Sequence, residues 1–284
     1  MIVVTGATGT IGRELVRLLA EGGRQVRAVT REPAGRPDLP GVDWVRGDLA
    51  DRAGLAPVLE GASRLFLLTG NQDDMVRLQK NAVQAAGVAG VEAVVKLSAL
   101  GASDHSKSLI GLWHHNVEQA LRESGMAWTI LRPHVFAQNL LSPVVFDRAA
   151  GRVYSASGDG AVPFIDTRDI AAVAAAVLTE DGHDGRTYTL TGPDAISYRQ
   201  ATEILGRVLE RPLAYVAETL DEAWTRRRAA GQPAWLVAAQ LALAEYQRAG
   251  AATAQTTDTV QRVTGRPART LEAFARDYAQ ELGA

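Results

Sequence analysis

The sequence contains no cysteine, which excludes disulfide bonds, thiolate metal ligands and a cysteine nucleophile. It also lacks an excess of basic residues. The formal net charge is -2 and no long basic run is present, which argues against a nucleic-acid partner. Long hydrophobic runs are missing too, since stretches such as residues 171–178 fall far short of the roughly 20 residues that span a bilayer. Residues 1–4 lead straight into a glycine turn without an export signal, so we expect a cytoplasmic protein.

What is present is typical of a globular protein, with 46% hydrophobic and 22% charged residues. Short β-branched or aliphatic runs alternate with segments of helical periodicity, which is the signature of βαβ units. This alternation predicts an α/β, Rossmann-type doubly wound parallel sheet. The predicted strands are 2–5, 25–30, 43–45, 64–69, 93–97, 128–131 and 187–190, and the predicted helices are 12–21, 74–86, 112–124 and 167–178.

The pattern changes after residue 192 and becomes mainly helical. Helices are predicted over 197–210 and 220–231, and residues 233–247 are alanine-rich. One strand is predicted at 213–216 and a loop of small residues over 249–257. We therefore expect a dinucleotide-binding domain over 1–192 and a smaller, mainly helical, substrate-covering lobe over 193–284, to which the loop 134–163 contributes.

A glycine turn follows the first predicted strand and opens the first predicted helix. The first glycine permits the tight turn, the second lets the backbone approach a pyrophosphate, and the free N–H groups at the helix start attract its charge. A glycine-rich surface turn is the structural alternative. The turn predicts dinucleotide contacts from Gly6, Thr8, Gly9, Thr10, Ile11 and Gly12.

The end of the second strand indicates which dinucleotide binds. Arg31 favours NADP(H), because a basic residue there accepts the 2'-phosphate. Glu32 would bind a ribose hydroxyl if the strand ended later, and Arg31 as a solvated loop charge is the other alternative. Further cofactor contacts are expected where the strands end, at Asp48, Leu49, Thr69, Gly70, Lys96 and Pro133, and substrate contacts at His134, Phe136 and Asn139. Two of these residues have an alternative interpretation without a ligand: Lys96 as a solvated residue and Phe136 as a core residue.

The chain resembles the atypical short-chain dehydrogenase/reductase superfamily, and within it the NmrA-like group of triphenylmethane and quinone reductases and isoflavone-reductase relatives. The resemblance covers the whole chain and implies the same fold and an NADP(H) cofactor. It rests on residues 5–12, Arg31, 47–49, 97–99, 118–133, 164–170 and 191–193.

The chain departs from this superfamily at the catalytic pair, which is usually Tyr followed four residues later by Lys. Counting back from Glu118 places Ile110 and His114 at these positions. In the isoflavone-reductase relatives the catalytic lysine also falls at position 114. The resemblance thus points to His114 as the group that donates a proton or supports an anion, and to Ser98 as a second catalytic candidate. Packing at a helix start is the alternative for His114, and capping of a loop is the alternative for Ser98.

The chemistry of His114 follows from its ring and its place on the helix. An imidazole titrates near neutrality, so we expect a donor whose pKa needs no large shift. His115 points about 100° away from His114 on the helix, and no histidines show ligand spacing, so we expect no metal site. An inward stripe that leaves His114 at its flank, facing a cleft, is predicted from Trp113, Val117, Ala120, Leu121 and Ser124.

These observations favour an NADPH-dependent reductase that transfers hydride to an aromatic, quinone-like or conjugated carbonyl compound. The missing Tyr and Lys disfavour ordinary alcohol–ketone interconversion. A non-catalytic NAD(P)-binding sensor of the NmrA type and a non-redox enzyme on the same fold remain alternatives. We expect a small-molecule substrate, no nucleic-acid or membrane partner, and a monomer or homodimer.

Overall fold

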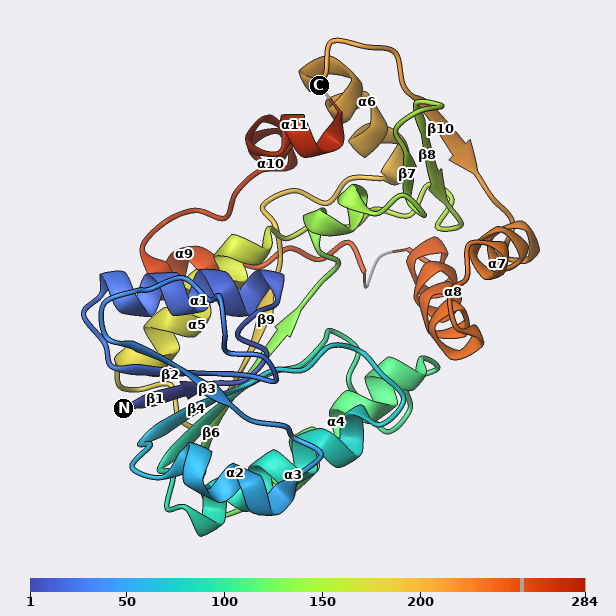
Figure 1. Cartoon of the computed structure of the whole chain (residues 1–284). Coiled ribbons are helices and arrows are strands. Elements are labelled where there is room, and N and C mark those ends of the chain that lie inside the picture. Colours follow the sequence, from blue (N-terminus) through green and yellow to red (C-terminus); the bar gives the residue numbers. More distant parts are fainter. Residues whose placement is uncertain (251–252, 284) are drawn as a thin grey trace. The chain divides into compact units, whose positions relative to one another are not determined.

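A computed structural model describes residues 1–250 and 253–283. The chain divides into two compact units (Figure 1), the first made of residues 1–106, 110–132 and 170–189 and the second of 107–109, 133–169 and 190–284. The predicted loop 134–163 falls in the second unit, whose last segment begins at residue 190. Two residues of the predicted loop 249–257, namely 251–252, lie outside the described residues.

The first unit contains a seven-stranded sheet in the order β3-β2-β1-β4-β5-β6-β9. The strands are Ile2–Val4 (β1), Val26–Thr30 (β2), Val42–Arg46 (β3), Arg64–Leu67 (β4), Ala93–Leu97 (β5), Ala127–Pro133 (β6) and Arg186–Leu190 (β9). Neighbouring strands from β3 to β6 pair in parallel. This confirms the predicted doubly wound sheet, whose strand order reverses between β1 and β4, where such folds bind ligands at the carboxyl ends of the strands.

Helices cover both faces of this sheet. They are Thr10–Glu21 (α1), Arg52–Leu59 (α2), Met75–Val88 (α3), Leu109–Arg122 (α4) and Thr167–Thr179 (α5). In Figure 1, α1 and α5 lie over one face and α2, α3 and α4 over the other. Helix α2 was not predicted from the sequence; it is short and has Pro57 inside it. Its start is fixed by the Asp51 side chain, which accepts a hydrogen bond from the N–H of Gly54 at 3.0 Å.

The core of the first unit explains why its strands are short apolar runs. The three residues of β1 and the five of β5 are all buried, as expected of central parallel strands covered on both faces. The buried face of α4 carries Val117 and Leu121 into the same cluster as Val3, Leu65 and Val94. The helices are thereby held against the sheet by apolar packing.

The second unit is built mainly from helices around a small sheet of order β10-β8-β7. Its strands are Phe146–Asp147 (β7), Arg152–Ser155 (β8) and Ala214–Ala217 (β10), and its helices are Ala137–Leu141 (η1), Tyr198–Val208 (α6), Leu220–Ala229 (α7), Ala234–Arg248 (α8), Thr259–Thr264 (α9), Leu271–Asp277 (α10) and Ala279–Leu282 (α11). The predicted strand at 213–216 is confirmed as β10. Strands β7 and β8 were not predicted, because both lie in the segment 134–163, which was predicted to be a loop.

Capping fixes the starts of two helices in the second unit. Ser197 and Gln200 form a reciprocal capping box at α6, and Thr219 and Glu222 form another at α7.

Nowhere in residues 1–250 and 253–283 is a helix long and apolar enough to cross a membrane.

Candidate active site

The glycine turn after β1 has a backbone shape that only glycine allows at two positions. Gly6 has a φ of 62°, in the left-handed region, and a Cβ there would lie 2.8 Å from the carbonyl oxygen of Leu68. A Cβ on Gly12 would lie only 2.1 Å from the carbonyl oxygen of Gly6. The turn and the start of α1 therefore pack backbone against backbone, as the pyrophosphate-binding turn of a Rossmann fold requires.

The start of α1 is open to an anion. Gly9 precedes the helix with no side-chain cap, and the first turn carries no acidic residue. Thr8, Gly9 and Thr10 are exposed, whereas Ile11 and Gly12 are buried. Free N–H groups and the positive end of the helix dipole thus meet solvent at this turn, and the residues present fit a dinucleotide phosphate.

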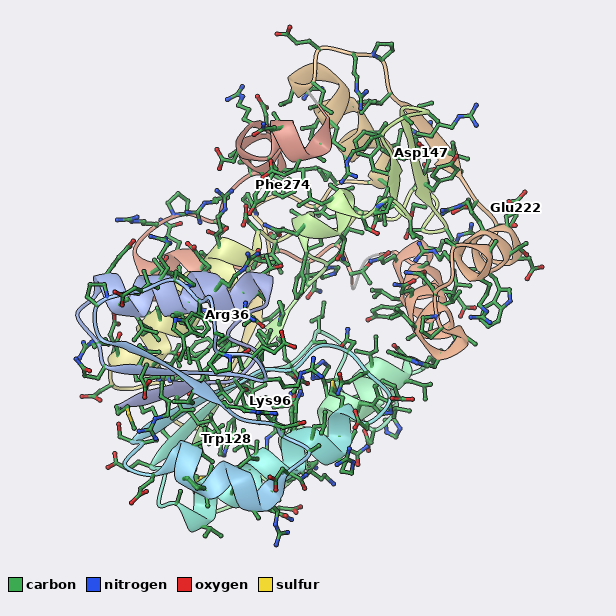
Figure 2. The ribbon with its side chains drawn as sticks, viewed as in Figure 1. Arg36, Lys96, Trp128, Asp147, Glu222 and Phe274 are labelled. Atoms are coloured by element: carbon green, nitrogen blue, oxygen red, sulfur yellow. The ribbon has the colours of Figure 1, made fainter. Side chains whose placement is uncertain are left out.

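The loop after β2 carries two cations. Arg31 is exposed, directly after the strand, and Glu32 is exposed beside it. The Glu32 backbone is held in a turn, since its N–H donates to the Thr30 hydroxyl at 3.2 Å and its carbonyl accepts from Arg36 Nε at 2.9 Å. Arg36, labelled in Figure 2, was not predicted from the sequence as a cofactor contact. The only signal for it in the sequence is that it is a second basic residue in the same loop as Arg31.

The neighbouring strand ends differ in how free their side chains are. Asp48 is exposed and accepts the N–H of Ala50 at 2.9 Å, while Leu49 packs partly buried against the core. The Thr69 hydroxyl accepts from Gln79 Nε2 at 2.7 Å, and Gly70 is exposed. All of these residues belong to the first unit, together with the glycine turn.

Lys96, the fourth residue of β5, is entirely buried (Figure 2). Its Nζ lies 3.0 Å from Nδ1 of His114 and donates to the Leu97 carbonyl oxygen at 3.0 Å. The alternative that Lys96 is solvated is therefore wrong. His114 is 7% exposed, so it belongs to the buried face of α4. The predicted flank position is also wrong, because Trp113 and Ala120 are only half-buried and the inward face includes His114 itself.

Burial changes the protonation chemistry of this pair. Burial lowers the pKa of Lys96 to about 7, against the opposing attraction of Glu118. Burial, with Lys96 and Arg132 adding like charge, holds the pKa of His114 well below its usual value of 6.5. The expectation that His114 titrates near neutrality is thus wrong: the imidazole is neutral at working pH.

Ser98 is joined to α4 through a buried carboxylate. Its Oγ donates to Glu118 Oε1 at 2.5 Å, and Glu118 is 0% exposed. Arg132 donates to both oxygens of Glu118, from Nε at 2.9 Å and from Nη2 at 2.5 Å, and Arg122 donates at 3.1 Å. Burial raises the pKa of Glu118, but these hydrogen bonds outweigh it and lower the pKa below its usual value.

From the sequence, Glu118 and Arg132 were predicted only as parts of the family motif 118–133, without a role in the site. The buried residues Lys96, Ser98, His114 and Glu118 form, with the half-buried Arg132, a cluster that joins β5, α4 and β6. Helical spacing placed Glu118 four residues after His114, which puts both on one face of the helix. The four-residue spacing was the sequence signal that could have indicated a role for Glu118. It becomes informative only when the residues of β5 that face this side of α4 are known.

The remaining predicted residues belong to the second unit. Pro133 and His134 are buried, Phe136 is half-buried and Asn139 is exposed. Nδ1 of His134 accepts from the N–H of Val135 at 2.7 Å, and burial lowers the pKa of His134 to about 4. These residues are not part of the Lys96 cluster of the first unit.

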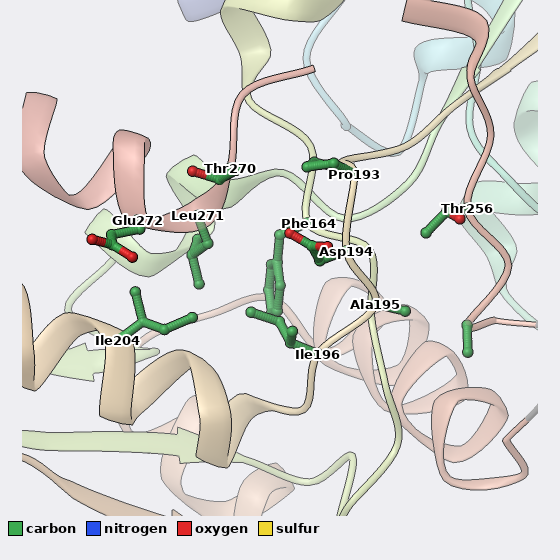
Figure 3. Close-up of a pocket in the computed structure, with 11 residues that line it drawn as sticks. Phe164, Pro193, Asp194, Ala195, Ile196, Ile204, Thr256, Thr270, Leu271 and Glu272 are labelled. Carbon is green, nitrogen blue, oxygen red and sulfur yellow. The ribbon is translucent and has the colours of Figure 1, made fainter. Parts of the chain in front are cut away.

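The second unit also contains an open pocket of about 570 Å³ (Figure 3). None of His134, Phe136 and Asn139 is among its lining residues. Its wall combines apolar side chains with two carboxylates and is formed by Phe164, Pro193, Asp194, Ala195, Ile196, Ile204, Ala254, Thr256, Thr270, Leu271 and Glu272. Across the described part of the chain, no three His, Asp or Glu side chains are grouped so as to hold a metal ion.

The strand order, the backbone-packed glycine turn and the uncapped start of α1 define a Rossmann-type dinucleotide-binding fold. The chain belongs to the NmrA-like family, whose profile matches residues 1–227.

Two curated relatives resemble the chain over nearly its whole length. The NAD(P)H azoreductase of Xenophilus azovorans is 40% identical over 291 residues, covering 100% of both chains. The (4-alkanoyl-5-oxo-2,5-dihydrofuran-3-yl)methyl phosphate reductase of Streptomyces griseus is 41% identical, covering 99% of this chain and 98% of that protein. Among solved structures, the NADPH-dependent quinone oxidoreductase of Escherichia coli complexed with NADPH is 26% identical, with a TM-score of 0.85 and coverage of 98% and 100%.

Proposed function

We propose that the protein is an NADPH-dependent reductase that transfers hydride to an aromatic, quinone-like or conjugated carbonyl compound. The observation that carries this proposal is the buried Lys96–His114 pair, with Nζ and Nδ1 3.0 Å apart, where β5 ends in the dinucleotide-binding unit. A neutral imidazole that contacts a lysine ammonium through one ring nitrogen is suited to donate a proton from its other ring nitrogen. Relatives of the chain are named as reductases of azo, dihydrofuranone and quinone compounds, and these names agree with such an acceptor.

The residues of the first unit have distinct roles in this proposal. Gly6, Gly9 and the N–H groups at the start of α1 bind the pyrophosphate, and Arg31 with Arg36 accepts the 2'-phosphate. Asp48 and Leu49 flank the adenine, and Thr69 and Gly70 contact the cofactor beyond β4. When bound, NADPH supplies the hydride. His114 donates a proton to the reduced acceptor, and the surplus positive charge of Lys96 and Arg132 steadies the anion that forms.

In this proposal Pro133 remains a predicted contact of the cofactor, and His134, Phe136 and Asn139 remain predicted contacts of the acceptor. Quinones and related compounds accept hydride readily, so one weak donor suffices where the usual Tyr and Lys are replaced by Ile110 and His114. We retain the predicted dinucleotide-binding domain over 1–192 and the substrate-covering lobe over 193–284, to which the loop 134–163 contributes.

We also propose that the protein is an atypical short-chain dehydrogenase/reductase and that it works in the cytoplasm. It acts on a small molecule as a monomer or homodimer, without a nucleic-acid partner. A size-exclusion measurement with light scattering tests the oligomeric state.

The test of the function is NADPH oxidation followed at its absorbance band against a panel of quinones, azo dyes and conjugated ketones. Oxidation that requires an acceptor, with the reduced acceptor recovered in equal amount, is the expected result. NADPH binding without turnover on every acceptor would contradict the reductase and indicate a non-catalytic sensor instead.

A further inference from the structure

Lys96 has an unusual position for a lysine. It is 0% exposed in a central strand, yet neither of its hydrogen-bond partners is a carboxylate: they are the Leu97 carbonyl oxygen and Nδ1 of His114, each at 3.0 Å. The nearby carboxylate of Glu118 instead accepts from Arg132, Arg122 and Ser98. A buried ammonium is costly unless it is paired, so its placement against an imidazole needs an explanation other than stability.

The hydrogen bond fixes the state of the imidazole. A charged ammonium has donors and no lone pair, so Nδ1 of His114 must be the acceptor. The ring is neutral, because burial and the cations Lys96 and Arg132 disfavour imidazolium. Its one hydrogen is therefore on Nε2, the nitrogen that can donate to an acceptor molecule.

A neutral imidazole cannot give up its Nε2 hydrogen alone, because imidazolate would result. It can do so if Nδ1 receives a proton in the same step. We propose that Lys96 is a positioning residue that sets the Nε2–H form of His114 and supplies Nδ1 with the proton that replaces the one His114 gives to the reduced acceptor. This inference rests on the proposed function, since it assigns the proton source for that reaction.

The step balances in atoms and charge. Hydride forms a C–H bond on the acceptor and leaves an electron pair on an oxygen or nitrogen of the acceptor. The Nε2–H bond of His114 breaks and its proton joins that atom, while a proton moves from Nζ of Lys96 to Nδ1. The imidazole is neutral before and after, and Lys96 is left as a neutral amine. Once the product has left, Nε2 of His114 takes a proton from water while Nδ1 returns its proton to Nζ of Lys96, which restores the starting state.

The charged groups around Lys96 make this transfer possible near neutral pH. Glu118 on α4 raises the pKa of Lys96, whereas burial and Arg132 on β6 lower it, to about 7. His114, also on α4, is neutral and adds no charge. The ammonium is present below that value and is lost as the pH rises through it, so the proton supply should fall above about pH 7.

Nuclear magnetic resonance tests the pair without turnover. The chain has five histidines and only three lysines, namely Lys80, Lys96 and Lys107, so isotope labelling of each type gives few signals. We expect the His114 ring to be in the Nε2–H form at pH 6 and the Lys96 amine to titrate near pH 7. Lys96→Met, which keeps the length of the buried side chain without its charge, should convert the ring to a mixture of both forms.

Kinetics separate a proton supplier from a structural lysine. In the wild type, kcat should fall about tenfold per pH unit above pH 7, with KM for the acceptor nearly constant. Lys96→Met should lower kcat at pH 6 by at least tenfold and abolish this decline. Lys96→Arg, which donates to Nδ1 but does not lose its proton, should keep the Nε2–H form while kcat stays low. Lys80→Met, on α3, is the matched control and should resemble the wild type.

The outcomes separate this inference from the proposed function. A His114 ring that stays wholly in the Nε2–H form in Lys96→Met, or a decline in kcat above pH 7 that persists in that variant, would overturn the inference while the reductase stands. A protein that binds NADPH but turns over no acceptor would overturn the proposed function, and with it the proton supply, whatever form the His114 ring takes.

Discussion

Ser98 and Glu118 are joined by a hydrogen bond of 2.5 Å between the end of β5 and the middle of α4. Glu118 is fully buried and holds this place because Arg132 on β6 and Arg122 on α4 neutralise it. The contact fixes the distance between the strand that carries Lys96 and the helix that carries His114. Glu118 thereby supports the candidate active site without needing to touch a ligand.

Glu118→Gln should destabilise the protein. Removing one partner of a buried ion pair leaves the arginines uncompensated, so we expect a loss of about 3 kcal/mol. The folded-state pKa of Glu118 is lowered, so its contribution is fully present above its usual pKa near 4.5 and is lost as the pH falls through the folded-state value. Urea unfolding at pH 7 and at pH 4 measures the difference, which should shrink at the lower pH. Glu123→Gln, at an exposed position just after α4, should change stability little.

Gly9→Ala should weaken cofactor binding without unfolding the protein. Gly9 is exposed with an ordinary φ of -76°, and a Cβ there would meet the Gly6 oxygen at 3.4 Å, which is normal contact. The added methyl group would, however, occupy space that a pyrophosphate needs. We expect at least tenfold weaker NADPH binding by calorimetry, with a melting temperature within a few degrees of the wild type. Gly22→Ala, at the other end of α1, should bind normally. Unchanged affinity in Gly9→Ala would show that the phosphates bind elsewhere.

Cofactor preference should depend on the loop after β2. We expect NADPH to bind at least tenfold more tightly than NADH, because Arg31 and Arg36 can pair with the 2'-phosphate. Fluorescence titration of both cofactors measures this ratio in the wild type, Arg31→Ala and Arg36→Ala. Glu32→Ala is the control, and should leave NADPH binding unchanged or slightly tighter. Equal affinities of the wild type for NADPH and NADH would refute the prediction that Arg31 binds the 2'-phosphate.

Sequence periodicity predicted the first unit well because its signals are local. The strand 93–97 has the bounds of β5, and the glycine turn falls where β1 ends and α1 begins. The small sheet of β7, β8 and β10 was harder, because its pairing joins residues far apart in the chain, such as Tyr154 and Val216. No window of the sequence contains that pairing.

The candidate site was predicted in part, for a related reason. His114 and Ser98 were found by position and Lys96 was predicted as a cofactor contact, but the pairing of His114 with Lys96 and of Ser98 with Glu118 was not predicted, because a hydrogen bond across β5 and α4 has no fixed spacing in sequence. The protonation state of His114 was predicted wrongly for the same cause: it depends on burial and on Lys96 and Arg132, which the fold brings together. A lone lysine in the apolar strand 93–97 is the one sequence signal that could have indicated a buried role for Lys96.

Replacing His114 should impair turnover more than binding. His114→Ala removes the Nε2–H donor, so we expect kcat to fall by roughly 10²-fold or more while the dissociation constant for NADPH stays nearly unchanged. Stopped-flow single turnovers with a quinone, alongside a fluorescence titration of NADPH, separate the two effects. His115→Ala is the matched control, because His115 is half-buried on another side of α4 and should matter less. Full turnover by His114→Ala on every acceptor would mean that solvent protonates the product, and that hydride transfer here depends on proximity alone.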